Sequence, residues 1–535
     1  MSRPFRQLAL AALLLLALGL RLVGLNEHPV DADEAMHLHP RPAQEALTFD
    51  LMFNPPLFRV LTAAVAEVER TIPAARLLPA AAGTLSVLLL YLLGARLLGP
   101  QPGLLAAFLL AVHPWHIRHS QTIRCFALLT FLVVLFELLG SSRTRLARGS
   151  SDLEGSRDAS GDVDAPLPEP RRGFPTRDVA EVVVLTLALL THYLAFPFAA
   201  AHAVRTFLTG SRRRAVSAAV ATAVVSLGLL PFLIGGTERK LGGGAPYEAG
   251  LAFLWSLARA SLTPGGLSMA AALLLLVLGA RDRSARPLLF APAVWIGATL
   301  SAGLAIPIEV RYCLPALPFL LLLAANGAWR WWNGTAPWSV TAGSASGGTL
   351  RPRWARLAGA TATVLLVLGV MRPLPAYLAA PRDPGAALAL HPDLSHVEVD
   401  LRPFLPVLSR SIDAASPIFV AVLGPFHYRL AAEMSGGRYP DEAVLSENEE
   451  GSTLTAGNLL LVSADPDSVQ LRPSDDARGE RHGECLLLRE PVFPCAPAPG
   501  CVPLRVEEGM ELYRCGPESC GSFPCRSDRG EEGGP

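Results

Sequence analysis

The sequence has little charge and almost no lysine. Only 17% of its 535 residues are charged, 46 basic residues balance 46 acidic ones, and Lys240 is the one lysine. A soluble globular chain carries about 25% charged residues, and a nucleic-acid-binding domain shows a basic face or stripe that is missing here. Apolar residues instead make up 51% of the chain, and its mean hydropathy is +0.36. This composition excludes a wholly disordered chain and predicts a polytopic membrane protein.

Charge is absent from several apolar runs that are long enough to cross a bilayer, which takes about 20 residues as a helix. The first run follows Arg3 and Arg6, as the core of a signal peptide would. No small-residue cleavage site follows it, however, and we expect an uncleaved first helix. The charge-free runs lie at 77–95, 215–237, 264–280, 287–308 and 312–329. Shorter or interrupted runs lie at 7–25, with Arg21 inside it, and at 103–117, 125–140 and 357–371, and we expect these to be spans as well.

The stretch 182–204 decides the predicted topology. As one helix it would place the Arg-rich loop 141–177 and Arg212–Arg214 on opposite sides of the membrane. As a short hairpin that turns near Thr191-His192-Tyr193, it places every arginine cluster on one side, as the positive-inside rule favours. We therefore expect about eleven transmembrane helices in a multi-pass protein of the cell membrane. The N-terminus then lies in the cytoplasm, and the loop 26–76 and the C-terminus lie outside.

Composition divides the chain into a transmembrane domain at 1–377, a small extracytoplasmic α/β domain at 378–490 and a Cys-rich tail at 491–535. The loop 141–177 is rich in Ser, Asp, Arg, Gly and Pro without periodicity, which predicts a disordered cytoplasmic linker. In the α/β domain, the predicted elements are strands at Ile418–Leu423 and Leu459–Ser463 and a helix at Tyr428–Met434. The predicted fold class is an all-α polytopic membrane protein with a small outer α/β domain.

Six of the eight cysteines lie in this tail or just before it. Their density among Pro, Gly and Arg predicts a disulfide framework, which forms in an oxidising compartment and agrees with an outward C-terminus. A zinc site is the competing interpretation, although no C-x-x-C spacing is present. The six residues are Cys485, Cys495, Cys501, Cys515, Cys520 and Cys525. Cys125 and Cys313 lie in predicted spans, where we expect them to pack as apolar residues.

A cluster of carboxylates and histidines follows the first predicted span: Asp31, Asp33, Glu34, His37 and His39. The plainest interpretation is a solvated loop. The cluster nevertheless lies where the chain leaves the membrane, and burial there raises carboxylate pKa values toward the range useful in acid–base chemistry. Asp33 and Glu34 are therefore candidate catalytic residues. The other three are candidate neighbours of an acceptor or a metal.

A second outward segment, His113–Arg124, carries Trp115 and His116. Aromatic and cationic side chains commonly form the anchor belt of a membrane interface, which is one interpretation of this segment. An arginine at the start of a helix also suits a phosphate held at headgroup depth, which makes Arg124 a candidate phosphate ligand. His116 is a further candidate neighbour of an acceptor or a metal.

Two later segments carry ionisable side chains at membrane depth. His192 and Tyr193 lie at the tip of the predicted hairpin, and Glu309, Arg311 and Tyr312 lie at the outer end of a span. A lone histidine in an apolar stretch is often a packed core residue, and Glu309 with Arg311 would also form a simple ion pair. Ionisable groups at this depth are functional candidates by default. His192, Tyr193, Arg311 and Tyr312 are therefore candidate ligands of a donor molecule.

These segments together resemble the protein mannosyltransferase-like group of the GT-C glycosyltransferases (glycosyltransferase family 39). The matching segments, in chain order, are Asp33-Glu34-Ala35, Asn54-Pro55-Pro56-Leu57, Arg76 to Gly99, His113-Pro114-Trp115-His116-Ile117 with Ser120-Gln121 and Arg124, Thr191-His192-Tyr193, and Arg311-Tyr312-Cys313-Leu314-Pro315. They cover residues 1–330 in the order and spacing of the family. Thr122 stands where the family pattern has an acidic residue, and Arg59 stands where it tends to have an aromatic one.

The resemblance implies an inverting transferase with a polyprenyl-phosphate sugar as donor and an acceptor outside the cytoplasm, whether protein, lipid or glycan. Asp33 would take the acceptor's proton, with Glu34 beside it. Arg124 and Arg311 would neutralise the leaving phosphate. No cofactor is required and no nucleic acid is expected as partner.

The remaining family-implied contacts concern the donor and a metal. His192, Tyr193 and Tyr312 would touch the lipid-linked sugar. Asp33 with His37 or His39 would suit a divalent metal, although the chemistry does not demand one.

Three other functions compete with this one. A transporter or lipid flippase typically shows repeated halves and a midplane site, and neither pattern is found in the sequence. A catalytically inactive membrane scaffold would need the Cys-rich tail and not Asp33 or Arg311. An O-antigen-polymerase-like enzyme would leave the Asp33-Glu34 segment without a role.

Overall fold

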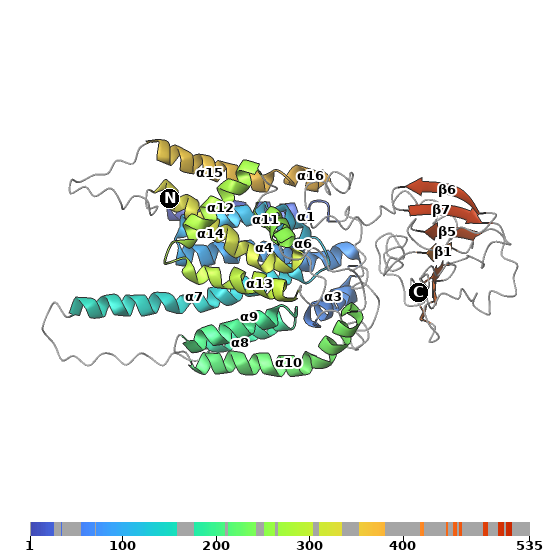
Figure 1. The fold of residues 1–535 in the computed structure, drawn as a ribbon, viewed down its shortest axis with the longest axis horizontal. Coiled ribbons are helices and arrows are strands. Elements are labelled where there is room, and N and C mark those ends of the chain that lie inside the picture. The colour runs from blue at the N-terminus through green and yellow to red at the C-terminus, as the bar shows by residue number, and fades with distance from the viewer. Residues whose placement is uncertain are drawn as a thin grey trace, which may run out of the picture. The chain divides into compact units, whose positions relative to one another are not determined.

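The structure is a computed structural model (Figure 1). It describes residues 2–25, 34, 55–69, 71–157, 176–208, 212–241, 251–262, 266–302, 310–333 and 353–379, and seven strands between residues 418 and 515. The chain divides into two units. The first comprises Met1–Leu25, Leu47–Leu61 and Arg76–Ser395, and the second comprises Asn26–Ala46, Thr62–Ala75 and His396–Pro535.

Leu- and Ala-rich helices make up the first unit. They are α1 (Arg3–Leu22), α3 (Leu57–Val68), α4 (Ile72–Leu97), α5 (Pro100–Ala111), α6 (Pro114–Ser120), α7 (Phe126–Arg157), α8 (Thr176–Leu189), α9 (Ala195–Leu208), α10 (Arg212–Leu241), α11 (Leu251–Ser261), α12 (Gly266–Ala280), α13 (Phe290–Ala302), α14 (Leu317–Trp332), α15 (Arg353–Met371) and α16 (Leu374–Ala379), with the 3-10 helices η3 (Arg286–Leu289) and η4 (Val310–Ala316). The unit boundaries divide two of these helices, because the second unit takes α3 from Thr62 onward and α4 up to Ala75. Proline opens α1, α5 and α6, where its fixed φ suits the first helical turn.

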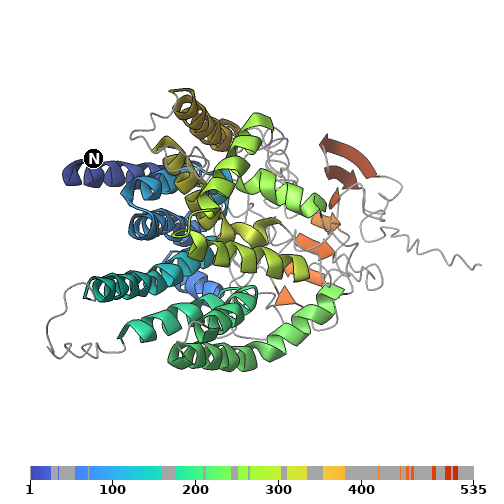
Figure 2. The ribbon, with the colours of Figure 1, turned by 60° about the vertical axis from the view of Figure 1, so that its left-hand side comes forward.

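Among the described residues, four helical segments are long and apolar enough to cross a membrane: Arg3–Leu22, Ile72–Leu97, Val310–Trp332 and Arg356–Leu378. The pair α11 and α12 forms a fifth if the 88° bend between them lies within one span. Helices α7, α8, α9 and α10 lie side by side in both views (Figures 1 and 2). The prediction of a multi-pass membrane protein is confirmed. The count of eleven spans and the sidedness of the termini remain predictions.

The predicted break in the stretch 182–204 is present. Helix α8 ends at Leu189 and α9 begins at Ala195. His192 forms the turn between them, because its Nδ1 accepts a hydrogen bond from the Leu194 amide at 3.1 Å and its carbonyl accepts one from the Ala195 amide at 3.0 Å. The chain therefore turns near Thr191-His192-Tyr193, where the distribution of arginines predicted a turn.

The prediction of a disordered linker from residue 141 onward is wrong for the first part of that segment. Helix α7 continues to Arg157. No proline occurs between Phe126 and Pro166, and nothing in the backbone therefore forces the helix to end at the membrane boundary. Residues 158–175 lie outside the described part of the chain.

Two pairs of helices pack with their backbones in direct contact at glycines. A Cβ atom added to Gly279 of α12 would lie 1.8 Å from the Leu323 carbonyl oxygen of α14, and one added to Gly327 of α14 would lie 1.8 Å from the Leu275 carbonyl oxygen. In the same way, a Cβ on Gly94 of α4 would lie 2.6 Å from Cα of Gly103 in α5. Small residues at such crossings let membrane helices approach closely, which maximises van der Waals contact where no hydrophobic effect drives association.

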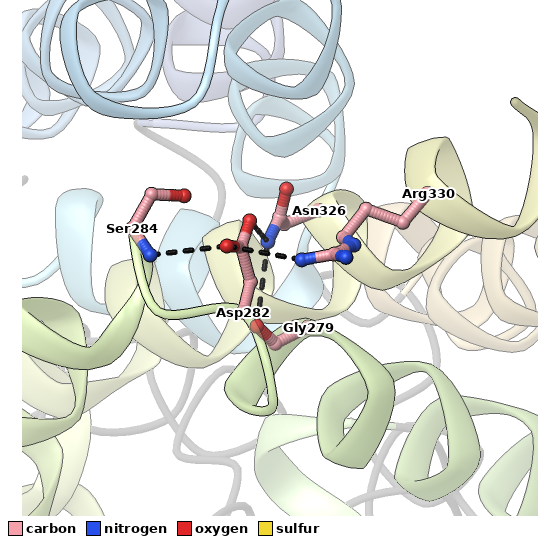
Figure 3. Close-up of polar contacts among 5 residues, drawn as sticks. All are labelled: Gly279, Asp282, Ser284, Asn326 and Arg330. Carbon is pink, nitrogen blue, oxygen red and sulfur yellow. Dashed lines mark hydrogen bonds and ion pairs between the residues drawn. The ribbon is translucent and has the colours of Figure 1, made fainter. Parts of the chain in front are cut away.

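A polar cluster holds α12 and α14 together beyond their glycine contact (Figure 3). Asp282 accepts hydrogen bonds from the Ser284 amide at 3.0 Å and from Asn326 Nδ2 at 3.2 Å, and it pairs with Arg330 Nη1 at 3.0 Å. Asn326 Nδ2 also donates to the Gly279 carbonyl at 3.3 Å. Partial burial works to raise the pKa of Asp282, but these bonds and the Arg330 charge outweigh it and lower the pKa of that carboxyl. Asp282 therefore bonds to Asn326 and Arg330 of α14 in its ionised, carboxylate form.

A seven-stranded sheet forms the described part of the C-terminal region. Its strands are β1 (Ile418–Ala421), β2 (Ser446–Glu447), β3 (Thr453–Ala456), β4 (Leu459–Val462), β5 (Cys485–Arg489), β6 (Cys501–Glu507) and β7 (Met510–Cys515), in the spatial order β2-β3-β4-β1-β5-β7-β6. Strand β1 runs parallel to β4 and β5, and the other pairs are antiparallel.

The strands predicted at 418–423 and 459–463 are present as β1 and β4, which are neighbours in the sheet. The predicted helix at Tyr428–Met434 lies outside the described residues, and the α/β class of this region stays a prediction. Strands β6 and β7 belong to the segment 491–535, which we expected to be a separate tail. The sheet thus crosses the boundary drawn at residue 490, because β7 pairs with β5 along its length.

The sheet register aligns three of the six cysteines. Cys515 is the Cα partner of Cys485 on one side and of Cys501 on the other. Cys495, Cys520 and Cys525 lie outside the described residues. The disulfide framework remains a prediction.

We expect Gly279→Ala to lower the free energy of unfolding by about 1–3 kcal/mol, because the added methyl group must push α12 and α14 apart. Gly297→Ala is the matched control, since Gly297 lies in helix α13 with no atom within 4 Å of an added Cβ. That change should be neutral or stabilising by up to about 1 kcal/mol. Thermal unfolding of the two variants in detergent tests this, and equal melting temperatures would contradict the close helix contact.

We expect the contribution of Asp282 to stability to depend on pH in one direction. Because its pKa is lowered in the folded state, the contribution is present above the unfolded pKa of about 4 and is lost as the pH falls through the lower folded value. Asp282→Asn should therefore melt below the wild type at pH 7 and approach it near pH 3. A difference in melting temperature that stays constant over this range would show that the charge of Asp282 is not what ties α12 to α14.

Candidate functional site

The segment His113–Arg124 is packed inside the first unit. Helix α6 is a largely buried helix of about two turns between α5 and α7, and Trp115 is only 1% exposed. His113, which precedes α6, has its Nε2 at 3.2 Å from the Ser261 carbonyl at the end of α11. The anchor-belt interpretation is therefore wrong for this segment, because an interfacial belt would leave Trp115 against lipid headgroups.

An aromatic cluster gathers residues from three distant parts of the chain. The ring centroid of Phe126 lies 5.5 Å from that of His192 and 5.9 Å from that of Tyr312, and the centroids of His192 and Tyr312 lie 5.7 Å apart. His119 of α6 adds a fourth ring at 5.4 Å from Phe126. The cluster joins α6, the start of α7, the α8–α9 turn and η4. It therefore brings together two predicted donor ligands, His192 and Tyr312, from segments that are far apart in sequence.

Two arginines flank this cluster along the chain. Arg124 precedes the start of α7 and is 9% exposed, and its amide donates to the Thr122 carbonyl at 2.7 Å. Arg311 directly precedes Tyr312 in η4 and is half-buried. A further bond holds η4, because the Trp295 indole donates to the Tyr312 carbonyl at 2.7 Å. Of the two candidate phosphate ligands, Arg311 is therefore adjacent in sequence to Tyr312, and Arg124 lies two residues before Phe126.

Tyr193 lies beside the cluster in the α8–α9 turn. Burial raises the pKa of its phenol to about 12. Its hydroxyl is buried and makes no hydrogen bond to any residue that the structure describes. The side chain therefore offers a neutral hydroxyl donor at the edge of the site.

The Asn-Pro-Pro-Leu segment is tied to the same turn. The amide of Leu57, at the start of α3, donates to the Leu190 carbonyl at 2.9 Å, and Phe58 is buried next to it in sequence. Asn54 lies outside the described residues. The segment therefore supports the turn that carries His192.

The side chain of His116 is hydrogen-bonded inside the first unit. Arg21 of α1 is fully buried and donates to the His116 Nδ1 at 2.7 Å, to the carbonyls of Ala17 at 2.8 Å and Ala111 at 3.3 Å, and to that of Leu110 at 3.4 Å. The Nδ1 of His116 is therefore occupied as an acceptor, and only its Nε2, which has no partner among the described residues, is left for an acceptor or a metal.

The role of Arg21 was not predicted from the sequence. The signal was present, because an arginine within an apolar span is costly unless it bonds inside the protein. Gln121 lies in a segment that resembles the family, but no role was predicted for it. His119 and Tyr377 carry no sequence signal beyond polarity inside apolar surroundings.

Most of the predicted acidic segment lies outside the described residues: Asp31, Asp33, His37 and His39. Glu34 is described and is fully buried, and it belongs to the second unit. Within the described residues no three His, Cys, Asp or Glu side chains form a group that could hold a metal. The metal at Asp33 thus stays a prediction.

Comparisons with known proteins agree with this architecture. Residues 54–145 match the model of the dolichyl-phosphate-mannose-protein mannosyltransferase family. ArnT from Cupriavidus metallidurans bound to undecaprenyl phosphate superposes with a TM-score of 0.53 at 16% identity, over 96% of this chain and 98% of that chain. The apo state of the same enzyme gives a TM-score of 0.51 at 17% identity, over 94% and 97%. No curated protein sequence matches the chain.

The segment that matches the family model contains α6 and Arg124, and the structural likeness to ArnT covers 96% of this chain. The chain therefore has the fold of ArnT, and its segment 54–145 is similar to the dolichyl-phosphate-mannose-protein mannosyltransferase family.

Proposed function

We propose that the protein transfers a hexose from a polyprenyl-phosphate donor to an acceptor outside the cytoplasm, with inversion at the anomeric carbon. The observation that carries the proposal is the contact among Phe126, His192 and Tyr312. It joins two segments that resemble the family, those of His192 and Tyr312, to the start of α7, which follows a third such segment directly. The fold supports the choice of donor, since a solved protein with this fold is bound to undecaprenyl phosphate.

The leaving group sets the first chemical requirement. A polyprenyl phosphate departs as an anion and needs no strong general acid, but its developing charge must be neutralised in the transition state. Arg124 and Arg311 are the cations that we assign to this role. Arg124 is 9% exposed, and a charge removed from water acts more strongly on a phosphate than an exposed one does.

The donor sugar would lie against the aromatic cluster. His192 and Tyr312 present ring faces and edges to one another, and Tyr193 contributes a neutral hydroxyl with no described partner. A neutral phenol can donate to a sugar oxygen without adding charge near the leaving phosphate. We assign donor binding to these three residues.

Inversion requires a base on the face of the sugar opposite the phosphate. The acceptor oxygen forms a bond to the anomeric carbon while the bond from that carbon to the phosphate oxygen breaks. The acceptor's proton passes to Asp33, and the electron pair leaves with the polyprenyl phosphate. Glu34 would orient Asp33 or bind the acceptor. A divalent metal bound by Asp33 with His37 or His39 is the alternative, and removal of metal with a chelator distinguishes it by loss of transfer.

We expect Asp33→Asn to lower the rate of transfer by about 10²–10⁴, because the amide keeps the size of the carboxylate but cannot take a proton. Binding of the donor should survive. The measurement is transfer of radiolabelled sugar from polyprenyl phosphate by protein in liposomes. Full activity of this variant would remove Asp33 as the base, and absence of transfer by the wild type from any of several polyprenyl-linked sugars would overturn the proposed function.

We expect Arg311→Ala to weaken donor binding itself by about 10- to 100-fold, since a bond to a charged group contributes about 1.5–3 kcal/mol. Arg212→Ala is the matched control, because Arg212 is exposed at the start of α10. Titration of both variants with polyprenyl phosphate measures the affinity without any turnover. Equal dissociation constants for Arg311→Ala and the wild type would exclude Arg311 as a phosphate ligand. If the protein were a catalytically inactive scaffold, neither variant would change the affinity for polyprenyl phosphate.

A further inference from the structure

A groove of about 440 Å³ lies between α1 and α14, and both helices pack against α5. Its volume is within the range of about 300–1,000 Å³ that is typical of sites for small ligands. All of its lining belongs to the first unit. The lining residues that matter here are Ala9 and Leu13 of α1, Gln101, Leu105 and Phe108 of α5, and Trp329 of α14.

The polar groups of this lining lie at one end of the groove. Gln101 is the second residue of α5, and Trp329 is in the last turn of α14. Leu105 and Phe108 lie one and two turns farther into α5, and Leu13 lies in the middle of α1. The groove is therefore polar where α5 begins and α14 ends, and it is apolar farther in. A phospholipid changes in the same way from its headgroup to its acyl chains.

The polar end of the groove lies at a membrane boundary. Both α1 and the segment Val310–Trp332 are long and apolar enough to cross a bilayer. Trp331 and Trp332 follow Trp329 directly, and Trp332 is 54% exposed, as in the aromatic belt of a membrane interface. Tyr312 of the aromatic cluster lies 17 residues before Trp329, which is about 25 Å of helix. The groove is therefore at the other end of α14 from the proposed donor site.

Arg6 places a positive charge at the polar end. It lies one turn before Ala9 and two turns before Leu13, and this spacing puts the three residues on one face of α1. A long side chain on a helix leans toward the helix N-terminus, which carries the guanidinium of Arg6 past the end of the groove toward headgroup depth. The Nε of Arg6 is buried and makes no hydrogen bond to any residue in the described part of the chain.

The stretches of chain that form this end contain no Asp or Glu. They are residues 1–13, 96–108 and 326–333, and their basic residues are Arg3, Arg6, Arg96 and Arg330. Asp282 of α12 pairs with Arg330 at 3.0 Å and neutralises that charge (Figure 3). Arg3 and Arg6 leave this end of the groove basic. An anionic headgroup complements it, whereas a zwitterionic headgroup brings a cation of its own.

We propose that the groove binds one anionic phospholipid of the surrounding bilayer, with an acyl chain between α1 and α14 and the phosphate at Arg6. The inner part of the groove lies within the depth of the bilayer, where an acyl chain supplies the van der Waals contacts that its walls would otherwise lack. Lipid chains are as apolar as this lining, so the lining does not select among lipids. The charge at the headgroup end makes the selection. This inference does not depend on the proposed transfer reaction.

Arg6→Gln tests the headgroup end. Native mass spectrometry of the full-length protein in detergent, with phosphatidylglycerol or phosphatidylcholine of the same chains added stepwise, measures the two affinities. The wild type should prefer phosphatidylglycerol. Arg6→Gln should weaken the binding of phosphatidylglycerol about fivefold, the effect of one basic residue at an anionic surface, and leave phosphatidylcholine unchanged. Arg212→Gln is the matched control, because Arg212 is an exposed arginine at the start of α10.

Ala9→Leu tests the apolar part, because the larger side chain occupies the space assigned to the acyl chain. It should weaken the binding of phosphatidylglycerol about tenfold. Ala11→Leu is the matched control, since Ala11 is exposed on another face of the same helix. Melting temperatures show whether the variants are folded. If Ala9→Leu loses its fold, Leu105→Phe fills the groove from α5 and makes the same test.

Three results would overturn the proposal. They are equal affinities of the wild type for the two phospholipids, wild-type binding of phosphatidylglycerol in Arg6→Gln, and wild-type binding in the folded variant that fills the groove.

Polyprenyl phosphate tests for a different occupant. It should not displace phosphatidylglycerol, because the site proposed for it lies around Tyr312, at the other end of α14. Displacement in the wild type that Ala9→Leu abolishes would show that the groove holds a polyprenyl chain, and the assignment to a bilayer phospholipid would be wrong. If the wild type binds no polyprenyl phosphate at all, the proposed donor fails, and the preference for phosphatidylglycerol still decides the identity of the lipid in the groove.

Discussion

The C-terminal carbonyls of α1 and α5 depend on two buried side chains for their hydrogen bonds. Arg21 donates to the carbonyls of Leu110 and Ala111 at the end of α5, and Gln121 donates to those of Leu20, Arg21 and Val23 at the end of α1. Water satisfies such groups in a soluble protein, but a helix end packed inside a membrane protein has no such partner. These bonds let both helices end inside the packed unit, which makes room for α6.

That arrangement explains why the candidate site is compact. Once α5 ends within the unit, α6 can cross between helices and place His119 against Phe126. The same geometry puts Arg124 at 9% exposure, away from bulk water. Charges in such surroundings act on a bound ligand with less screening than they would at a surface. The chemistry proposed for this end of the unit therefore depends on how α1 and α5 are terminated.

The sequence predicted those helices, turns and strands that depend on residues close to one another along the chain. Charge-free runs marked the helices, the distribution of arginine marked the α8–α9 turn at His192, and short apolar runs marked β1 and β4. The partners of Arg21, Gln121 and Tyr377 could not be predicted, because the bonds join residues 90, 101 and 256 positions apart and no periodicity encodes them. The strands β6 and β7 were missed for another reason. Cys, Pro and Gly around them suggested a loop, although Val502, Leu504 and Val506 alternate as in a strand.

The order of strands in the sheet has a consequence for how the protein is made. Strand β5 is paired with β1 on one edge and with β7 on the other, and β6 and β7 follow β5 along the chain. Until these two strands have been synthesised, β5 presents an open edge of backbone donors and acceptors, the kind of edge that recruits strands from other chains. A premature stop codon just after β5 would make this edge permanent. Such a truncated product should be a target of quality-control proteases even though every helix of the first unit has already been synthesised.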